Sequence, residues 1–222
     1  MTSLLMDWPY LGLAGAAALL LWLFVEERPS RGTPRGRDPA FVLGLFGPMY
    51  LLHQFEEHGV DLLGRHYAFL GALCHTLGYP SAATCPADPG FIAAVNPGAV
   101  WIAAALVMVF RRRRPLIAAC VWGIALVNAG THIGAALVHR AYNPGLVTAV
   151  VLFVPLCVWM LRTTLAAGVI TRRQVPRVIV SGALVHGVLL VSLLARVHGL
   201  PYAALLAINL ANGLTPWAVA AL

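Results

Sequence analysis

Residues 53–58 read His-Gln-Phe-Glu-Glu-His and follow directly on an apolar stretch that begins near residue 41. Four of these side chains, those of His53, Glu56, Glu57 and His58, can ionise or bind a metal. Such groups are costly to place in an apolar environment, so their clustering indicates a functional site. Residues three and four apart share one face of a helix, which predicts that His53 stacks with Glu56 and Glu57.

A second polar pair, Asn128 and His132, has the i, i+4 spacing of a shared helix face within a later apolar stretch. Both stretches are expected to cross a membrane in the same direction. The two polar groups then lie at a similar depth, and we expect them to face each other. Imidazoles and carboxylates are good ligands for zinc or iron, and a catalytic zinc keeps about three protein ligands and a water.

We therefore predict a divalent metal site, with zinc favoured over iron. The predicted ligands are His53, Glu57 and His132. In this interpretation Glu56 is the general base for a bound water, and Asn128 orients that water or the substrate. His58, at the end of the same helix, and His186, in the middle of another apolar stretch, are candidates for additional ligands.

The same side chains suit other functions. Intramembrane Glu and His are the usual carriers in proton- or ion-coupled transporters, which is the second hypothesis. A third is a redox protein in which His132 and His186 hold a cofactor such as a haem or a quinone. A fourth is a hydrogen-bonded polar cluster that only joins helices. Two adjacent carboxylates are costly for a purely structural contact, and few polar residues continue a transport path through the inner half.

The composition shows what kind of element must position these residues. The chain has 222 residues, of which 60% are hydrophobic and only 10% are charged. Soluble domains carry about a quarter charged residues. The composition therefore predicts an all-α, polytopic membrane protein. The net charge of +7 comes from arginines clustered between apolar stretches, so it does not indicate a nucleic-acid partner.

Seven stretches approach the length of about 20 apolar residues that a membrane helix needs. They cover approximately residues 9–25, 39–58, 91–110, 115–138, 144–161, 178–197 and 201–222. The Gly47-Pro48 pair inside the second stretch predicts a kink ahead of His53, because proline leaves a helix carbonyl without its partner.

Arginine is distributed unevenly between the connections. The connections after the first, third and fifth stretches hold four each, and those after the second, fourth and sixth hold one each. The positive-inside rule then places the N-terminus outside and the C-terminus inside a bacterial cytoplasmic (inner) membrane. The first stretch is followed, not preceded, by its positive charges, so we interpret it as an anchor. Those charges are Arg28, Arg31, Arg35 and Arg37.

Residues 59–90 are expected to form an extracytoplasmic loop inserted between the second and third helices. The loop contains Cys74 and Cys85, which could pair in an oxidising compartment. The spacing alone leaves open whether they do.

The motif from His53 to Glu57, with Asn128, His132 and the turn at residues 142–145, resembles the HXXEE-motif family of predicted bacterial integral membrane proteins. The resemblance covers roughly residues 40–160. It implies that His53, Glu56, Glu57, Asn128 and His132 form the characteristic polar set of the family, and it implies no particular reaction.

From these observations we expect a membrane-embedded, metal-dependent enzyme. A buried metal reached from the bilayer suits a hydrophobic or lipid-derived substrate, and the reaction expected at such a site is hydrolysis. The expected partners are the lipid bilayer and a hydrophobic small molecule or lipid, without nucleic acid.

Overall fold

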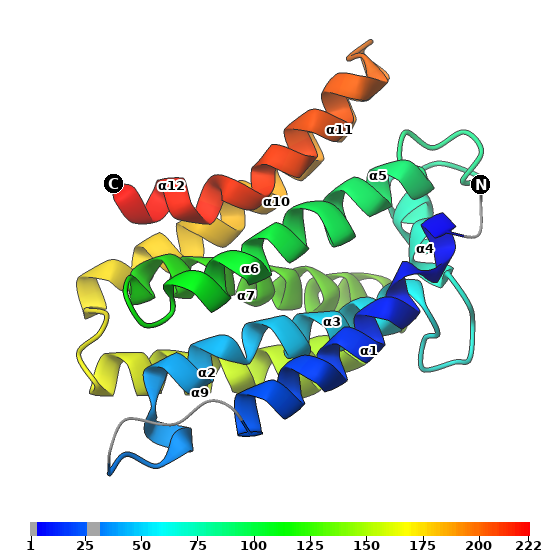
Figure 1. Ribbon diagram of the computed structural model, residues 1–222. Coiled ribbons are helices and arrows are strands. Elements are labelled where there is room, and N and C mark those ends of the chain that lie inside the picture. Colours follow the sequence, from blue (N-terminus) through cyan, green and yellow to red (C-terminus); the bar gives the residue numbers. More distant parts are fainter. Residues whose placement is uncertain (1–3, 26–31) are drawn as a thin grey trace.

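The structure is a computed structural model that describes residues 4–25 and 32–222, and its architecture is a bundle of helices (Figure 1). Within these residues no strand forms, and the β-type pairing is limited to an isolated bridge between Val60 and His66. The α-helices are α1 (Leu4–Val25), α2 (Pro39–Gly44), α3 (Phe46–His58), α4 (Ala68–Thr76), α5 (Pro89–Ala93), α6 (Trp101–Phe110), α7 (Pro115–His139), α8 (Leu146–Thr148), α9 (Val154–Ala166), α10 (Val175–Val197), α11 (Tyr202–Ala211) and α12 (Thr215–Ala221).

Two π-helical stretches join some of these α-helices into longer continuous helices. The stretch η2 (Ala94–Val100) joins α5 to α6, and η3 (Ala149–Phe153) joins α8 to α9. Three short 3-10 turns, η1 (Arg35–Arg37), η4 (Arg172–Gln174) and η5 (Asn212–Leu214), complete the helical elements. Such π-helical insertions are frequent near functional sites, and both of these carry or adjoin residues of the site described below.

In the described part of the chain, six helices are long and apolar enough to cross a membrane. They are Met6–Val25, Pro89–Phe110, Pro115–His139, Leu146–Ala166, Arg172–Val197 and Tyr202–Ala221. This confirms the expected all-α, multi-pass membrane class. The expectation of seven spanning helices is wrong by one, because residues 39–58 do not form a single long helix.

The break in this segment lies at Leu45, between α2 and α3. Pro48 has no N–H to donate to the carbonyl of Gly44, and its ring crowds the same carbonyl, so a regular helix cannot continue through this point. The sequence predicted a kink here, and the structure places it one turn earlier than the proline. The two carboxylates of α3 also lower the hydropathy of the segment.

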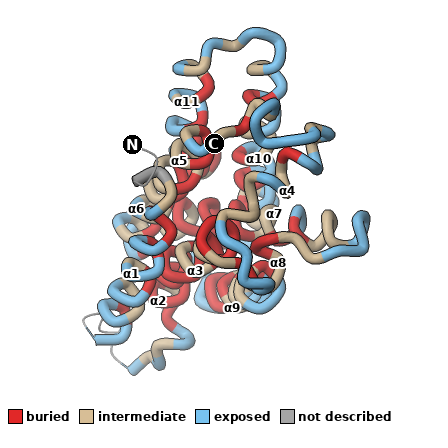
Figure 2. Tube along the Cα trace, turned by 90° about the vertical axis from the view of Figure 1, so that its right-hand side faces the viewer, coloured by how far each residue is buried: buried red, intermediate tan, exposed pale blue. Residues whose placement is uncertain are grey.

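α2 and α3 form the centre of the bundle. All of α2 after Pro39 and most of α3 are buried, and the view along the helices shows the buried residues gathered around them (Figure 2). Asp38 caps α2 by accepting a hydrogen bond from the Ala40 N–H at 2.9 Å, ahead of a proline at the first helical position. The polar end of α3 is therefore surrounded by other helices.

α7 and α10 run in the same direction and meet most closely at Gly123 and Gly182. A Cβ atom on either glycine would overlap the backbone of the other helix, so only glycine permits this approach. Beyond the contact, α10 and α11 tilt away from the remaining helices toward the end of the bundle that carries α4 (Figure 1). Both α7 and α10 contribute residues to the wall of the cavity described below.

The segment between α3 and α5, predicted as a loop insertion, contains the helix α4. Cys74 and Cys85 form a disulfide in the structure, with a Cα–Cα distance of 5.7 Å, which ties α4 to the connection that leads into α5. The arginines that follow the first predicted span are only partly visible, since Arg28 and Arg31 lie outside the described residues.

Candidate metal centre

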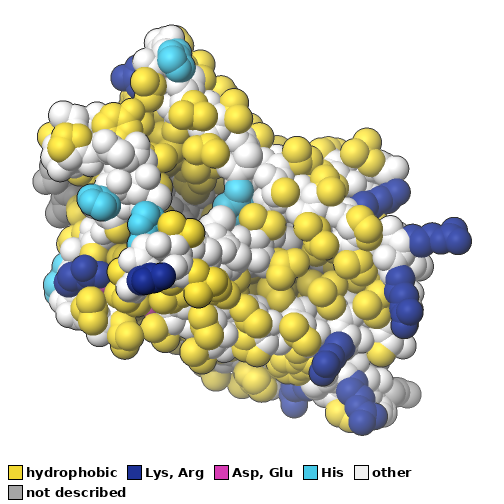
Figure 3. Space-filling view, turned by 180° about the vertical axis from the view of Figure 1, so that it is seen from behind, with side chains coloured by type: hydrophobic (Ala, Val, Ile, Leu, Met, Phe, Trp, Pro, Cys, Tyr) yellow, Lys and Arg dark blue, Asp and Glu magenta, His cyan; other side chains and the backbone are white. Residues whose placement is uncertain are grey.

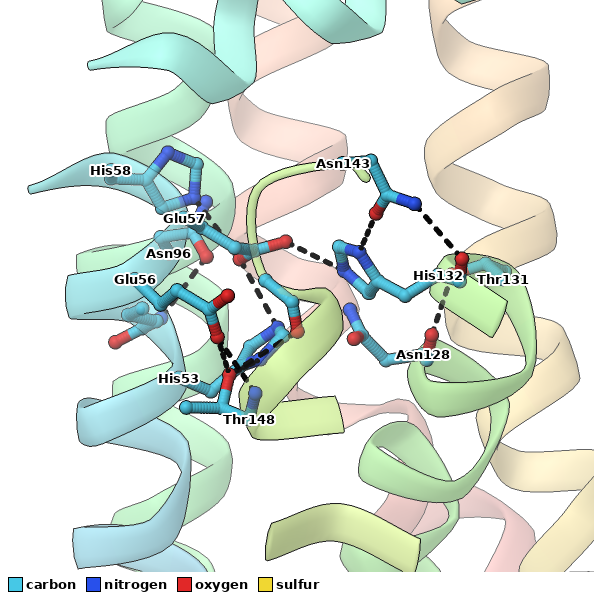
Figure 4. A network of polar contacts seen from close by, with 12 residues as sticks. His53, Glu56, Glu57, His58, Asn96, Asn128, Thr131, His132, Asn143 and Thr148 are labelled. Atoms are coloured by element: carbon cyan, nitrogen blue, oxygen red, sulfur yellow. Dashed lines mark hydrogen bonds and ion pairs between the residues drawn. The ribbon is translucent and has the colours of Figure 1, made fainter. Parts of the chain in front are cut away.

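The carboxylate of Glu57 lies between three imidazoles (Figure 4). Its Oε1 is 2.9 Å from Nε2 of His132, and its Oε2 is 3.4 Å from Nε2 of His53 and 3.3 Å from Nε2 of His58. His53 and Glu57 share a face of α3 because they are four residues apart, whereas His132 comes from α7. None of these four side chains is more than 6% exposed, so the cluster is buried inside the bundle.

His53 is held from behind by Thr148 at the end of α8. The Thr148 hydroxyl lies 2.8 Å from Nδ1 of His53 and 2.6 Å from Oε2 of Glu56. Its single hydrogen is donated to the Glu56 carboxylate, so its oxygen must accept a hydrogen from His53. This assigns the proton of a neutral His53 to Nδ1 and leaves Nε2 with a free lone pair directed at Glu57.

His132 is fixed in the same way by Asn143. The Asn143 Nδ2 donates to the backbone carbonyl of His132 at 3.0 Å, so the Oδ1 of the same amide faces Nδ1 of His132 at 2.6 Å. An amide oxygen can only accept, which assigns the proton of the imidazole to Nδ1. In the neutral imidazole, Nε2 of His132, which lies 2.9 Å from Oε1 of Glu57, then also presents a lone pair to the carboxylate.

These tautomers make the cluster a good fit for a cation. Two imidazole lone pairs and a carboxylate face one another, and each of them is an acceptor. Nε2 of His53 has no hydrogen-bond partner, although it is buried. The candidate ligand atoms of His53, Glu57 and His132 all lie within 4.8 Å of one another. Ligands of a single tetrahedral zinc are about 3.3 Å apart, so small movements would complete such a site.

Gly145 closes the cluster on the side of the α7–α8 connection. Its φ is +93°, which side chains rarely adopt, and a Cβ atom there would lie 2.7 Å from Cγ of Glu57. The same atom would be 2.7 Å from Cε1 of His132 and 2.9 Å from Cε1 of His53. Glycine is therefore required both for the turn and for the backbone to approach the three side chains.

The hydrogen bonds of the Glu56 carboxylate differ from those expected of the general base that the sequence predicted. Its Oε1 accepts hydrogen bonds from the Tyr142 hydroxyl at 2.9 Å and the Val147 N–H at 3.1 Å. Its Oε2 accepts from the N–H and the hydroxyl of Thr148, at 2.7 and 2.6 Å. A carboxylate engaged by four donors stabilises the start of the helix that begins at Leu146.

The tyrosine in this contact also reaches the loop after α3. The Tyr142 hydroxyl accepts a hydrogen bond from the Leu62 N–H at 3.1 Å and donates one to Glu56. Burial raises the pKa of Tyr142, the contact with Leu62 opposes this, and the hydrogen bond to the Glu56 carboxylate adds to the rise. The hydroxyl therefore stays protonated and serves as a donor to Glu56.

A cavity of about 370 Å³ leads to the cluster. Its walls come from α3, α4, α5, η2, α7 and α10, and Glu57, His58 and His132 border it. The hollow is visible in the face of the molecule opposite to that of Figure 1, surrounded by hydrophobic side chains (Figure 3). His53 and Glu56 are not part of its wall, so they lie behind the residues that a ligand would touch.

Two further residues predicted from the sequence border the same cavity. Asn128 lies one turn before His132 on α7, and its buried Oδ1 has no hydrogen-bond partner. His186 lies on α10, where its Nδ1 is 2.9 Å from the carbonyl of Gly182. His58 packs against the rings of Trp8 and Phe69 at the edge of the cluster. His186, a candidate for an additional ligand, thus borders the cavity but is not among the clustered ligand atoms of His53, Glu57 and His132.

The sequence reasoning did not assign a role to Asn143, Gly145 or Thr148, which hold or border the cluster. Residues 142–145 stood out as a turn that carries part of the family resemblance, but no role was predicted for their side chains. Their position directly after a helix that carries His132 was the available signal. Gln54 was likewise unassigned, and it donates to Asn96 Oδ1 at 3.0 Å and accepts from the Trp101 indole at 3.0 Å.

Comparison with protein families gives one match, over residues 44–160, to the family described as "Protein of unknown function with HXXEE motif". Neither curated proteins nor solved structures gave a match to the chain. The matched residues include α3, α7 and the turn before α8, and they therefore contain His53, Glu57, His58 and His132 of the cluster. Helices α1 and α10–α12 lie outside the match. The chain belongs to the family of proteins of unknown function that carry the HXXEE motif.

Proposed function

We propose that this protein is a membrane-embedded, metal-dependent enzyme that hydrolyses a hydrophobic or lipid-derived substrate. The observation that carries the proposal is the convergence of two imidazole lone pairs on the buried Glu57 carboxylate, at the end of an apolar cavity. Two imidazoles and a carboxylate occur as ligands both in catalytic zinc sites and in non-haem iron(II) sites. The proposal takes zinc because hydrolysis needs a Lewis acid and no change of oxidation state. An oxidative di-iron site would need about four carboxylates.

The proposed roles follow from where each side chain lies. His53, Glu57 and His132 would hold the ion, which when bound supplies Lewis acidity and lowers the pKa of a water. His58 borders the cavity and lies 3.3 Å from Glu57, so it is placed to take up a proton and return it. Asn128 offers an amide to the substrate.

The proposed role of Glu56 changes from general base to positioning residue. Its four hydrogen bonds direct it to the start of α8 and to Thr148, which in turn orients His53. A base must reach the proton that it abstracts, and Glu56 does not border the cavity.

A transporter using the same residues is the alternative, and the packing below the cluster argues against it. The ring of His53 lies 4.3 Å from that of Phe153 and 5.6 Å from that of Tyr50, measured between centroids. Phe46 and Trp122 fill the next layer and are fully buried. These packed aromatic side chains leave no evident continuation of the cavity past His53 among the described residues, which suits an enzyme better than a path through the membrane.

We also propose that the protein lies in a bacterial cytoplasmic membrane with the α4 end outside. In Figure 3 most of the arginine side chains gather at the end of the bundle away from the hollow, as the positive-inside rule requires of the cytoplasmic end. The Cys74–Cys85 disulfide would then lie in an oxidising compartment. Fluorescence of green fluorescent protein fused after α12 would support this orientation, and periplasmic alkaline phosphatase activity of the equivalent fusion would contradict it.

The metal content of the purified protein tests the proposed function. Inductively coupled plasma mass spectrometry should find about one zinc per chain in the wild type and little in His53→Ala, Glu57→Ala and His132→Ala. His139→Ala is the matched control, since His139 is exposed at the end of α7 and lies outside the cluster. A well-folded wild type without metal after zinc supplementation would overturn the metal site.

Hydrolysis is tested separately from metal binding. Zinc-loaded protein in nanodiscs should release a product from a bacterial lipid extract that includes uncharged, single-chain amphiphiles, detected by mass spectrometry, and the His132→Ala variant should not. If liposomes that contain the protein instead take up protons or ions, and no hydrolysis product is found, the protein is a transporter.

A further inference from the structure

The cavity opens sideways rather than toward an end of the bundle. Among its lining residues, Thr76 on α4, Thr131 on α7 and Leu190 on α10 are exposed, and they mark its mouth. The residues of α7 and α10 at this mouth follow Gly123 and Gly182 along their helices, beyond the point of closest contact. Exposed apolar side chains of the same two helices, Val138 and Val191, continue the surface around it. Such a surface on membrane-spanning helices would face lipid chains.

The chemistry of the wall restricts the charge of the ligand. No arginine is among the described residues that line the cavity, and the chain contains no lysine. Among the residues that line the cavity, Glu57 contributes a carboxylate, and the others contribute amides, hydroxyls, imidazoles and apolar side chains. Without a metal, a phosphate or carboxylate headgroup would enter without a cationic partner, which is costly in a buried site. With zinc bound, such a headgroup would take the open position that the hydrolytic water needs, so it does not suit a substrate.

The size of the cavity restricts the shape of the ligand. Its volume of about 370 Å³ is near the lower end of the range of ligand pockets, about 300–1,000 Å³. The lining is apolar at positions such as Phe91, Ile124 and Val185, which suits an aliphatic chain. A cavity of this size accommodates one chain of a lipid and excludes a second.

The amide of Asn128 supplies a specific contact. Its Oδ1 is buried and unpaired, and it lies one helical turn from the metal ligand His132. A buried acceptor without a partner costs about 1–3 kcal/mol, so a ligand that donates a hydrogen bond there gains affinity. The donor would be an N–H or an O–H group close to the reacting bond.

We propose that the substrate is an uncharged amphiphile with a single aliphatic chain, which enters from the bilayer between α7 and α10. Asn128 accepts a hydrogen bond from an N–H or O–H group of this molecule. The assignment of the molecule as a substrate rests on the proposed function, because it places the reacting bond beside His132 and Glu57. The binding of the amphiphile itself depends only on the cavity.

Binding of tritiated probes to the protein in nanodiscs, at equal mole fractions in the bilayer, tests this inference. N-Methyldodecanamide carries an N–H donor, whereas N,N-dimethyldodecanamide lacks it, and dodecyl phosphate has the same chain with an anionic head. We expect the wild type to bind the first about tenfold more tightly than the second. In the chelator-treated wild type, which lacks the ion that would attract an anion, dodecyl phosphate should bind at least tenfold more weakly than N-methyldodecanamide. Equal binding of the two amides, or preferred binding of dodecyl phosphate by the chelator-treated protein, would overturn the proposal.

Variants locate the binding. Asn128→Leu should reduce the tenfold preference between the amides to none. Leu190→Trp should close the mouth and abolish saturable binding, whereas Leu194→Trp should leave it unchanged. The two leucines are one turn apart on α10 and 47% and 52% exposed, but only Leu190 borders the cavity. Equal effects of the two tryptophans would place binding elsewhere.

The metal measurement separates this inference from the proposed function. Zinc in the wild type without a preference between the amides would overturn the ligand class alone. A preference between the amides in a protein that binds no metal would support the ligand class and overturn the enzyme. Retained preference in metal-free His53→Ala, whose substituted side chain does not border the cavity, would show that Asn128 acts independently of the ion.

Discussion

Asn143 contacts His132 through both ends of its amide, donating to the backbone carbonyl at 3.0 Å and facing Nδ1 at 2.6 Å. The first contact determines which end of the amide meets the ring, and the second then determines where the ring carries its proton. The lone pair of Nε2 is consequently directed at Glu57, as a metal ligand requires. The orientation of His132 is thus set by a residue in the turn before α8.

Replacing Asn143 should weaken metal binding without removing a ligand. We expect Asn143→Leu to lower zinc affinity by about 10- to 100-fold, the usual effect of losing a group that orients a ligand histidine. Asn143→Asp retains the acceptor for Nδ1–H and should stay much closer to the wild type. Zinc titrations with a competing chelator would measure both, and equal affinities of Asn143→Leu and wild type would contradict the role.

Glu56 and Thr148 should act as one unit. Thr148→Val removes the acceptor for His53, and Glu56→Gln replaces an acceptor by a donor that opposes the N–H groups at the start of α8. We expect each variant to lower zinc affinity by about 10- to 100-fold and the double variant to lower it little further.

Thr148→Ser keeps the hydroxyl and is the control for the pair. A general base behaves differently, because its loss lowers the rate while zinc affinity is retained. Glu56→Gln with full zinc content and no turnover would therefore restore the catalytic assignment of Glu56.

Much of the cluster could be predicted because helical periodicity and depth are readable from sequence. The i, i+4 spacing placed His53 and Glu57 on one face, and the common direction of two apolar stretches placed His132 at the same depth. The structure brings these three side chains together. The pairing of helices that run in the same direction needed no knowledge of the loops.

The residues that could not be predicted act through the turn between two helices. Whether Glu56 faces a cavity or the start of α8 depends on the path of residues 140–146, which periodicity does not describe. The span 39–58 was misjudged for a related reason. Its length and hydropathy suggested one helix, whereas the local effect of Pro48 on the Gly44 carbonyl divides it into α2 and α3.

Gly145 provides a test of the packing around the cluster. Gly145→Ala would place a methyl group within 3 Å of carbon atoms of Glu57, His132 and His53, at a φ of +93°. Gly199→Ala is the matched control, because Gly199 has a φ of +100° and nothing within 4 Å of the added Cβ. Both variants should lose about 1–2 kcal/mol from backbone strain, but only Gly145→Ala should also lose zinc. Equal zinc contents would show that the turn can move away from the cluster.

The loop after α3 should respond to acid through Asp61. Its Oδ1 accepts from the N–H groups of Leu63 and Arg65 at 2.9 Å, and its Oδ2 pairs with the Arg65 guanidinium at 2.7 Å. Burial alone would raise the pKa of Asp61, but these contacts with Arg65 and Leu63 stabilise the carboxylate and hold the pKa below its usual value. A depressed pKa means that the folded loop is favoured by ionisation.

The sign of the pH dependence follows from this shift. The contribution of Asp61 to loop stability is complete above the ordinary aspartate pKa of about 3.9 and is lost as the pH falls below it. Hydrogen–deuterium exchange, normalised for intrinsic rates, should therefore show lower protection of the Leu63 and Arg65 amides below about pH 4. Asp61→Asn should show the lower protection at every pH. Because Leu62 donates to Tyr142, which donates to Glu56, unchanged protection in Asp61→Asn would mean that the loop is held by this tyrosine instead.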